Sequence, residues 1–146
     1  HLNHVKPHGA LYNMACRDRK LADAITKAIF DFDPNLYLIG LANTEMQLAA
    51  KARGLRFVRK GFADRRYLEN GMLVPRNKEN ALITDPEEMI AQAIRMIQQD
   101  QIDTLCVHGD GPDALLFLKT LHTAFKDHQI SIQPFDQPPS TPPSYE

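Results

Sequence analysis

Leu36-Tyr37-Leu38-Ile39-Gly40-Leu41 is an almost unbroken apolar run. A strand with one solvated face alternates apolar and polar residues, whereas a run of this kind is typical of a parallel strand covered on both faces. Pro34 and Asn35 stand before it and end a helical pattern, and Gly54 ends the next one. The run therefore predicts a strand between two helices, which is the repeating unit of an α/β fold.

The same alternation of strand and helix extends along most of the chain. Further strands are predicted at residues 4–6, 55–58, 104–107 and 130–132, with helices after 18, 43, 85 and 114. Such repetition predicts parallel strands joined by right-handed crossovers. Glu69-Asn70-Gly71 predicts a hairpin turn inside a polar insertion. Residues 1–135 are expected to form the folded part, and the Pro-rich residues 136–146 a disordered tail.

The helix boundaries follow local rules. Asp18 introduces the first long helix, Asn43 or Thr44 can cap the next, and Asp85-Pro86-Glu87-Glu88 opens the third with a cap, a proline and two acids. Apolar spacing of three and four residues predicts the buried faces. These are Leu21, Ala24, Ile25, Ala28 and Ile29 in the first helix, and Met89, Ile90, Ala93, Ile94 and Ile97 in the third.

Composition excludes several classes of function. The 146 residues carry a net charge of −1, which gives no electrostatic basis for nucleic-acid binding. The 43% hydrophobic content suffices for an ordinary core, but no apolar run is long enough to span a membrane. Two cysteines are too few for a disulfide framework, and Cys106 is expected to be a reduced core thiol in a cytoplasmic protein. The start without Met suggests a piece of a longer protein.

Polar clusters follow three of the predicted strands. Lys6 and His8 follow the first, Asp64 and Arg65 the third, and His108 and Asp110 the fourth. Chemistry in parallel α/β folds gathers at the carboxyl ends of the strands, so these clusters are expected to share one site.

The first cluster combines several chemically able side chains. Lys6 can hold a carboxylate or phosphoryl group, and His8 can move a proton or bind a metal. The alternative is an exposed strand-end charge and a loop-capping histidine. Tyr12 and Asn13, about one helical turn further on, favour a site that binds substrate.

The other two clusters also admit two interpretations. His108 and Asp110 suit either a pair of metal ligands or a base with its orienting acid, while Gly109 and Gly111 allow close approach of a ligand. Asp110 can equally be a simple helix cap. Asp64 and Arg65 form either an ion pair that shapes the site or a solvated pair of little consequence. We assign no residue as a metal ligand.

Three blocks together resemble the LamB/YcsF family. They are His4-Val5-Lys6-Pro7-His8-Gly9-Ala10-Leu11-Tyr12-Asn13, then Phe62-Ala63-Asp64-Arg65-Arg66-Tyr67 with residues 71–76, and Cys106-Val107-His108-Gly109-Asp110. The resemblance covers residues 1 to about 135 and corresponds to the C-terminal half of a family member. It implies the C-terminal part of an irregular, seven-stranded TIM-like barrel of the type found in certain deacetylases.

The resemblance also implies a reaction, the ATP-dependent opening of the 5-oxoproline lactam to glutamate. In the family this is the work of the A component of 5-oxoprolinase, together with partner subunits B and C. ATP with Mg²⁺ would then be the co-substrate. On this basis Lys6, His8, His108 and Asp110 are the candidate catalytic residues. The candidate substrate-binding residues are Tyr12, Asn13, Asp64, Arg65, Gly109 and Gly111.

The chain departs from the family in two respects. Lys60 stands where family members usually carry Glu, and the N-terminal half with its own acidic motifs is missing. Half a barrel leaves sheet edges open, so the chain is expected to pair with another chain or a second copy, or to be part of a longer protein. Two other functions stay open: a metal-dependent deacetylase or amidohydrolase-like enzyme, and a catalytically incomplete binding or assembly module. The substrate is 5-oxoproline or a related lactam.

Overall fold

Helices and strands alternate from the first residues onward in the computed structural model, which describes residues 2–109 and 113–134. In the order of the chain, the elements are β1 (His4–Val5), α1 (Gly9–Ala15), α2 (Arg19–Phe32), β2 (Tyr37–Leu41), α3 (Glu45–Arg53), β3 (Arg56–Phe62), α4 (Pro86–Gln98), β4 (Thr104–Cys106) and α5 (Ala114–Asp127). The expected tail at 136–146 lies outside the described residues.

The strands form one parallel sheet in the order β1-β2-β3-β4. Val5 pairs with Leu38, Leu38 with Phe57, and Lys60 with Thr104. The parallel α/β prediction is confirmed, and all four strands end at the same edge. Over the described residues the sheet is open and four-stranded, so a closed seven-stranded barrel would need strands beyond it.

The predicted helix boundaries at Asp18, Asp85 and Gly54 are confirmed. The Asp18 carboxylate accepts from the Leu21 amide, and that of Asp85 accepts from the amides of Glu87 and Glu88. Gly54 ends α3 in the left-handed conformation, at φ 73°. Thr44 occupies the cap position of α3, but its hydroxyl donates to the Leu41 carbonyl instead of capping the helix. These local rules work because the orphan amides and carbonyls at helix ends require partners.

The buried face of α2 differs from the prediction. Ala22, Thr26 and Ile29 are buried, whereas Ala24 and Ala28 are exposed. The Thr26 hydroxyl donates to the Asp23 carbonyl, so the threonine is buried without leaving that group unpaired. Alanine is small enough to lie on either the buried or the exposed face of a helix. The spacing of Ala24 and Ala28 therefore led to a wrong prediction of the buried face.

The predicted last strand at residues 130–132 is absent from the sheet. The Ile130 amide donates to the Phe125 carbonyl and closes the end of α5, and Ile132 is 67% exposed. Among the described residues, β4 is therefore an edge strand on this side. The Ile130 amide, which a fifth strand would need, is already used at the helix end.

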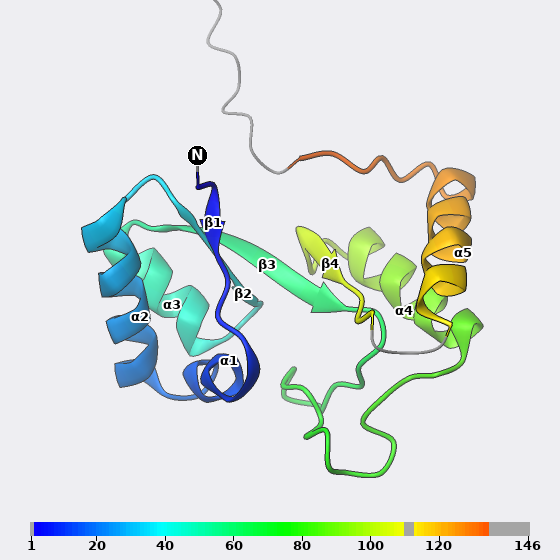
Figure 1. The fold of residues 1–146 in the computed structure, drawn as a ribbon, viewed down its shortest axis with the longest axis horizontal. Coiled ribbons are helices and arrows are strands. Elements are labelled where there is room, and N and C mark those ends of the chain that lie inside the picture. Colours follow the sequence, from blue (N-terminus) through cyan, green and yellow to red (C-terminus); the bar gives the residue numbers. More distant parts are fainter. Residues whose placement is uncertain (1, 110–112, 135–146) are drawn as a thin grey trace, which may run out of the picture.

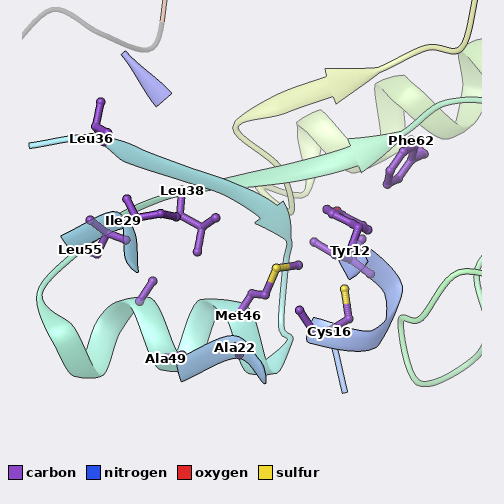
Figure 2. Close-up of a cluster of buried hydrophobic side chains, with 13 residues drawn as sticks. Tyr12, Cys16, Ala22, Ile29, Leu36, Leu38, Met46, Ala49, Leu55 and Phe62 are labelled. Carbon is purple, nitrogen blue, oxygen red and sulfur yellow. The ribbon is translucent and has the colours of Figure 1, made fainter. Parts of the chain in front are cut away.

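Two clusters of apolar side chains make up the core. One packs α1, α2 and α3 against β2 and includes Tyr12, Leu38 and Met46 (Figure 2). The other lies between β4, α4 and α5, around Ala93 and Phe117. In Figure 1, α1–α3 gather on one side of β3 and α4 and α5 on the other, with the loop between β3 and α4 extending from the end of β3. That loop contains the expected turn, because Tyr67 and Leu73 form an antiparallel bridge around it.

None of the described helices combines the length and apolarity that crossing a membrane demands.

Candidate functional site

The carboxyl ends of β1, β3 and β4 meet at one cavity of about 570 Å³. Side chains from all three predicted clusters line it, together with residues from α1 and from the loop after β3. Its walls include Lys6, His8, Tyr12, Asn13, Arg17, Lys60, Phe62, Arg65, Arg76, Cys106 and His108. Separate strand ends therefore line one cavity, as expected, and its role as a functional site stays a prediction.

The segment between β1 and α1 places the first cluster. Gly9 adopts φ 58°, which lets the chain turn sharply from strand to helix. His8 holds the cap position of α1, but its side chain makes no capping hydrogen bond and instead lines the cavity. The Asn13 amide donates to the Gly9 carbonyl, so one of its groups stabilises this turn. Lys6 and His8 both reach the cavity, as their two-residue spacing predicted.

His108 pairs with Asp64 across the neighbouring strand ends. The Asp64 Oδ2 atom lies 2.7 Å from His108 Nδ1 and accepts a second hydrogen bond, of 3.1 Å, from the His108 amide. The imidazole also stacks on the Phe62 ring, with centroids 5.7 Å apart. A carboxylate that holds one imidazole nitrogen leaves the other available to move a proton.

This geometry corrects the interpretation of the third strand end. Asp64 and Arg65 form no ion pair in the described part of the chain, because Asp64 turns toward His108. The expected orienting acid Asp110 lies outside the described residues, as does Gly111. Gly109 is exposed and has open space around its Cα, so its role in ligand approach stays a prediction.

Arg65 is a buried part of the cavity wall. It is 5% exposed, one of its Nη atoms donates to the Val74 carbonyl at 2.6 Å, and its Nε has no partner. Burial lowers its pKa. The buried Gln92 amide of α4 donates to the carbonyls of Phe62, Ala63 and Arg65 and so fixes the backbone from which Arg65 projects.

Lys60 is a buried member of the site that sequence reasoning did not assign. It is 5% exposed, and its Nζ lies 4.0 Å from the centroid of the Tyr12 ring and 4.6 Å from that of Phe62. Burial, opposed in part by Cys106 and reinforced by Lys6, lowers the pKa of Lys60 to about 8. The signal that pointed to it was its difference from the residue usual in the family, without any indication of where it would lie.

Several buried polar atoms at this site lack a partner. The Tyr12 hydroxyl, Asp64 Oδ1 and Arg65 Nε are three of the four such side-chain atoms in the described part of the chain. Tyr12 is 4% exposed, and burial raises its pKa far above the ordinary value, so the hydroxyl keeps its proton. Unsatisfied buried groups are rare in proteins, and their concentration here indicates a ligand or water that completes them.

The lining of the cavity is strongly cationic. Five of its residues are lysine or arginine, and none of the described residues that line it is Asp or Glu. A neighbouring cavity of about 530 Å³, which Lys60 also borders, differs because its Arg66 is paired with Glu88 at 2.8 Å. The cationic lining of the cavity at the strand ends suits an anionic ligand.

The remaining chemistry of the site is limited. Both cysteines are free; Cys106 is only partly buried and lines the cavity, whereas Cys16 is buried in the core, which raises its pKa to about 11. No cluster of three His, Cys, Asp or Glu side chains with the spacing of a metal site occurs among residues 2–109 and 113–134.

Comparisons with known proteins agree with this geometry. The sequence profile of the LamB/YcsF family matches residues 1–140. The A subunit of 5-oxoprolinase from Oceanobacillus iheyensis is 45% identical over 90% of this chain and 56% of its own length. A protein of the same name from Staphylococcus aureus is 43% identical over 90% of this chain and 58% of its own length.

The fold matches a solved structure as well. The lactam utilization protein of Thermus thermophilus superimposes with a TM-score of 0.82 at 39% identity, over 92% of this chain and 58% of that one. The chain thus spans a little more than half the length of each relative.

Proposed function

This chain belongs to the LamB/YcsF family, and we propose that it supplies the C-terminal part of a 5-oxoprolinase A subunit, which opens the lactam of 5-oxoproline to give glutamate. The observation that carries the proposal is the cationic cavity where β1, β3 and β4 end. 5-Oxoproline bears a carboxylate and ATP bears phosphates, and both fit such a lining. The names of the relatives supply the reaction.

An amide is hydrolysed very slowly by water, so the lactam must first be activated. Transfer of the γ-phosphoryl group of ATP, with Mg²⁺, to the lactam oxygen converts that oxygen into part of a leaving group. Water then adds to the activated carbon, and the C–N bond opens with the amine as leaving group, which gives an acyl phosphate of glutamate. A second water cleaves this acyl phosphate to glutamate and phosphate. Lys6, at the end of β1 and on the wall of the cavity, is suited to hold phosphoryl oxygens during this transfer.

His108 is suited to manage the proton of the attacking water. Asp64 fixes one nitrogen of the imidazole at 2.7 Å, and the stacked Phe62 ring restricts its tilt. A base oriented by a carboxylate is the arrangement that general-base catalysis requires. His8, exposed at the entrance, is the second group able to transfer a proton, here to the leaving nitrogen.

The proposal extends to the architecture and the partners. The open four-stranded sheet represents part of an irregular seven-stranded barrel whose other strands belong to the remainder of the protein. Subunits B and C complete the enzyme, and the exposed sheet edges are compatible with a homo-oligomer as well. Free cysteines and the need for ATP support a cytoplasmic location.

The test is glutamate release from 5-oxoproline and ATP in the presence of subunits B and C. We would assay this chain and, in parallel, a protein of the relatives' full length that contains it. Release that depends on ATP supports the proposal, and a Lys6→Ala variant should reduce it by orders of magnitude without unfolding the protein. If neither protein releases glutamate with subunits B and C that are active in a control reaction, the proposal is refuted. Another amide substrate or a binding role would then be favoured.

A further inference from the structure

Lys60 carries a charge that the fold leaves without an anionic partner. Its side chain is 5% exposed, and no carboxylate in the described part of the chain lies within ion-pair distance of its Nζ. Removing an ammonium group from water is costly unless an opposite charge compensates. The aromatic rings of Tyr12 and Phe62 offset part of that cost through their negative faces.

The Tyr12 hydroxyl adds a second unused donor next to Lys60. The ammonium lies over the Tyr12 ring, and both residues line the same cavity. The hydroxyl is buried and makes no hydrogen bond. A cation and a neutral O–H donor side by side form a natural pair of ligands for the two oxygens of one carboxylate.

The cavity has two levels that suit different anions. Its floor (Tyr12, Lys60, Phe62, Arg65) consists of residues that are 4% or 5% exposed. Its rim (His8, Arg17, Arg76) is exposed to solvent. The enclosed floor suits a small carboxylate beside the Lys60 ammonium, whereas the open, cationic rim suits a hydrated polyphosphate.

We propose that Lys60 and Tyr12 form a carboxylate subsite on the cavity floor, and that Lys60 selects an acid over the corresponding neutral amide. The assignment rests on the proposed function only for the identity of the ligand, a lactam that bears a carboxylate. The subsite accounts for the buried charge and for the unpartnered hydroxyl at once. It leaves the rim cations for the phosphates of the co-substrate.

The experiment measures binding separately from turnover. Dissociation constants of 5-oxoproline, of 2-pyrrolidinone (the same ring without a carboxylate) and of ATP are determined by calorimetry for the wild type and for Lys60→Met. We expect Lys60→Met to weaken 5-oxoproline at least tenfold while 2-pyrrolidinone and ATP change less than threefold. Lys51→Met, which removes an exposed lysine of α3, is the matched control and should change none of them.

Proton uptake on ligand binding gives a second measurement. A lysine with a purely structural role would not change this uptake. The groups that face Lys60 are Lys6 beyond β1, Tyr12 and Cys16 of α1, and Cys106 of β4. With the pKa of Lys60 at about 8, a carboxylate that binds at pH 8 should draw in a fraction of a proton. Calorimetry in two buffers of different ionisation enthalpy measures this uptake, which Lys60→Met should abolish.

The outcomes separate the subsite from the enzyme activity. Tight, Lys60-dependent binding of 5-oxoproline supports the subsite, and it refutes the proposed function if neither this chain nor the full-length protein then releases glutamate with competent subunits B and C. If the wild type binds no 5-oxoproline, acetate and benzoate compared with their amides take its place as probes. Equal losses for acids and amides in Lys60→Met, or a loss confined to ATP, overturn the subsite.

Discussion

The two faces of β3 carry positive charges in contrasting surroundings. On one face Arg59 binds Asp103 through its Nε at 3.0 Å and one Nη atom at 2.6 Å, and Asp100 at 2.9 Å. On the other face the adjacent Lys60 contacts aromatic rings and has no acid partner among the described residues. The hydrogen bonds that Arg59 donates to the carboxylates of Asp103 and Asp100 raise its pKa, whereas burial lowers the pKa of Lys60.

This contrast separates stabilising charges from functional ones. A paired guanidinium joins β3 to the start of β4 and lowers the free energy of the fold. An unpaired, buried ammonium raises that free energy and is expected where the missing partner is a ligand. The variants below test each side of the contrast.

The largest effect is expected at the cavity, from His108→Ala. Loss of the imidazole that Asp64 orients should reduce glutamate release by roughly 10²–10⁴-fold, the usual contribution of a general base. Far-ultraviolet circular dichroism and the urea midpoint should stay near those of the wild type. His122→Ala on α5, an exposed histidine, is the matched control. An unchanged rate for His108→Ala would remove this residue from the mechanism.

Lys60→Met should stabilise the protein at neutral pH. The pKa of Lys60 is about 8 in the folded state against 10.5 unfolded, so below pH 8 the folded state bears the full cost of the buried charge. That difference corresponds to about 3 kcal/mol, and removal of the charge should recover much of it at pH 7. Between pH 8 and 10.5 the wild type binds fewer protons folded than unfolded, so the cost of the buried charge shrinks and the gap to Lys60→Met closes.

Urea unfolding of both proteins at pH 7 and at a pH near 10 measures this gap. A Lys60→Met variant that is less stable than the wild type at pH 7 would show that the contacts with the rings outweigh burial. Lys60 would then belong with Arg59 as a structural charge, and the contrast between the two faces would fail.

Local rules explain which parts of the fold the sequence predicts. Asp18 and Asp85 are recognisable as caps because a helix start requires an acceptor within three residues. Lys6 and His108 could be placed in one site because parallel strands end at the same edge. Both inferences depend on the chain direction and nearby residues, which the sequence contains.

Contacts between distant residues explain what the sequence did not predict. Asp64 and His108 lie 44 residues apart, and only the register of β3 with β4 brings them together. Lys60 lies beyond the strand predicted at 55–58, and the sequence marked it only as a departure from the family, since its contact with the ring depends on where α1 places Tyr12. The shifted face of α2 and the missing strand at 130–132 likewise reflect packing and competing hydrogen bonds.

The smallest effect is expected on the paired face, from Asp103→Asn. Burial alone would raise the pKa of Asp103, but hydrogen bonds from Arg59 hold it below its ordinary value. Its contribution to stability is therefore present above about pH 4 and lost as the pH falls through the lowered pKa. Because the pair is partly exposed, we expect Asp103→Asn to cost about 1–2 kcal/mol at neutral pH and less at pH 3, below the ordinary pKa of an aspartate.

Urea unfolding at the two pH values measures that cost, and Asp100→Asn is the matched control because Asp100 is 88% exposed and should cost less than about 0.5 kcal/mol. Binding of 5-oxoproline should be unchanged in both variants, since Arg59 faces away from the cavity. If Asp103→Asn weakened binding as Lys60→Met does, the two faces of β3 would be coupled, and Lys60 would owe its position to the ion pair on the other face. We expect Asp103→Asn to lose stability and keep binding, and Lys60→Met to lose binding and gain stability. That pair of results would assign a structural role to one face of β3 and a ligand-binding role to the other.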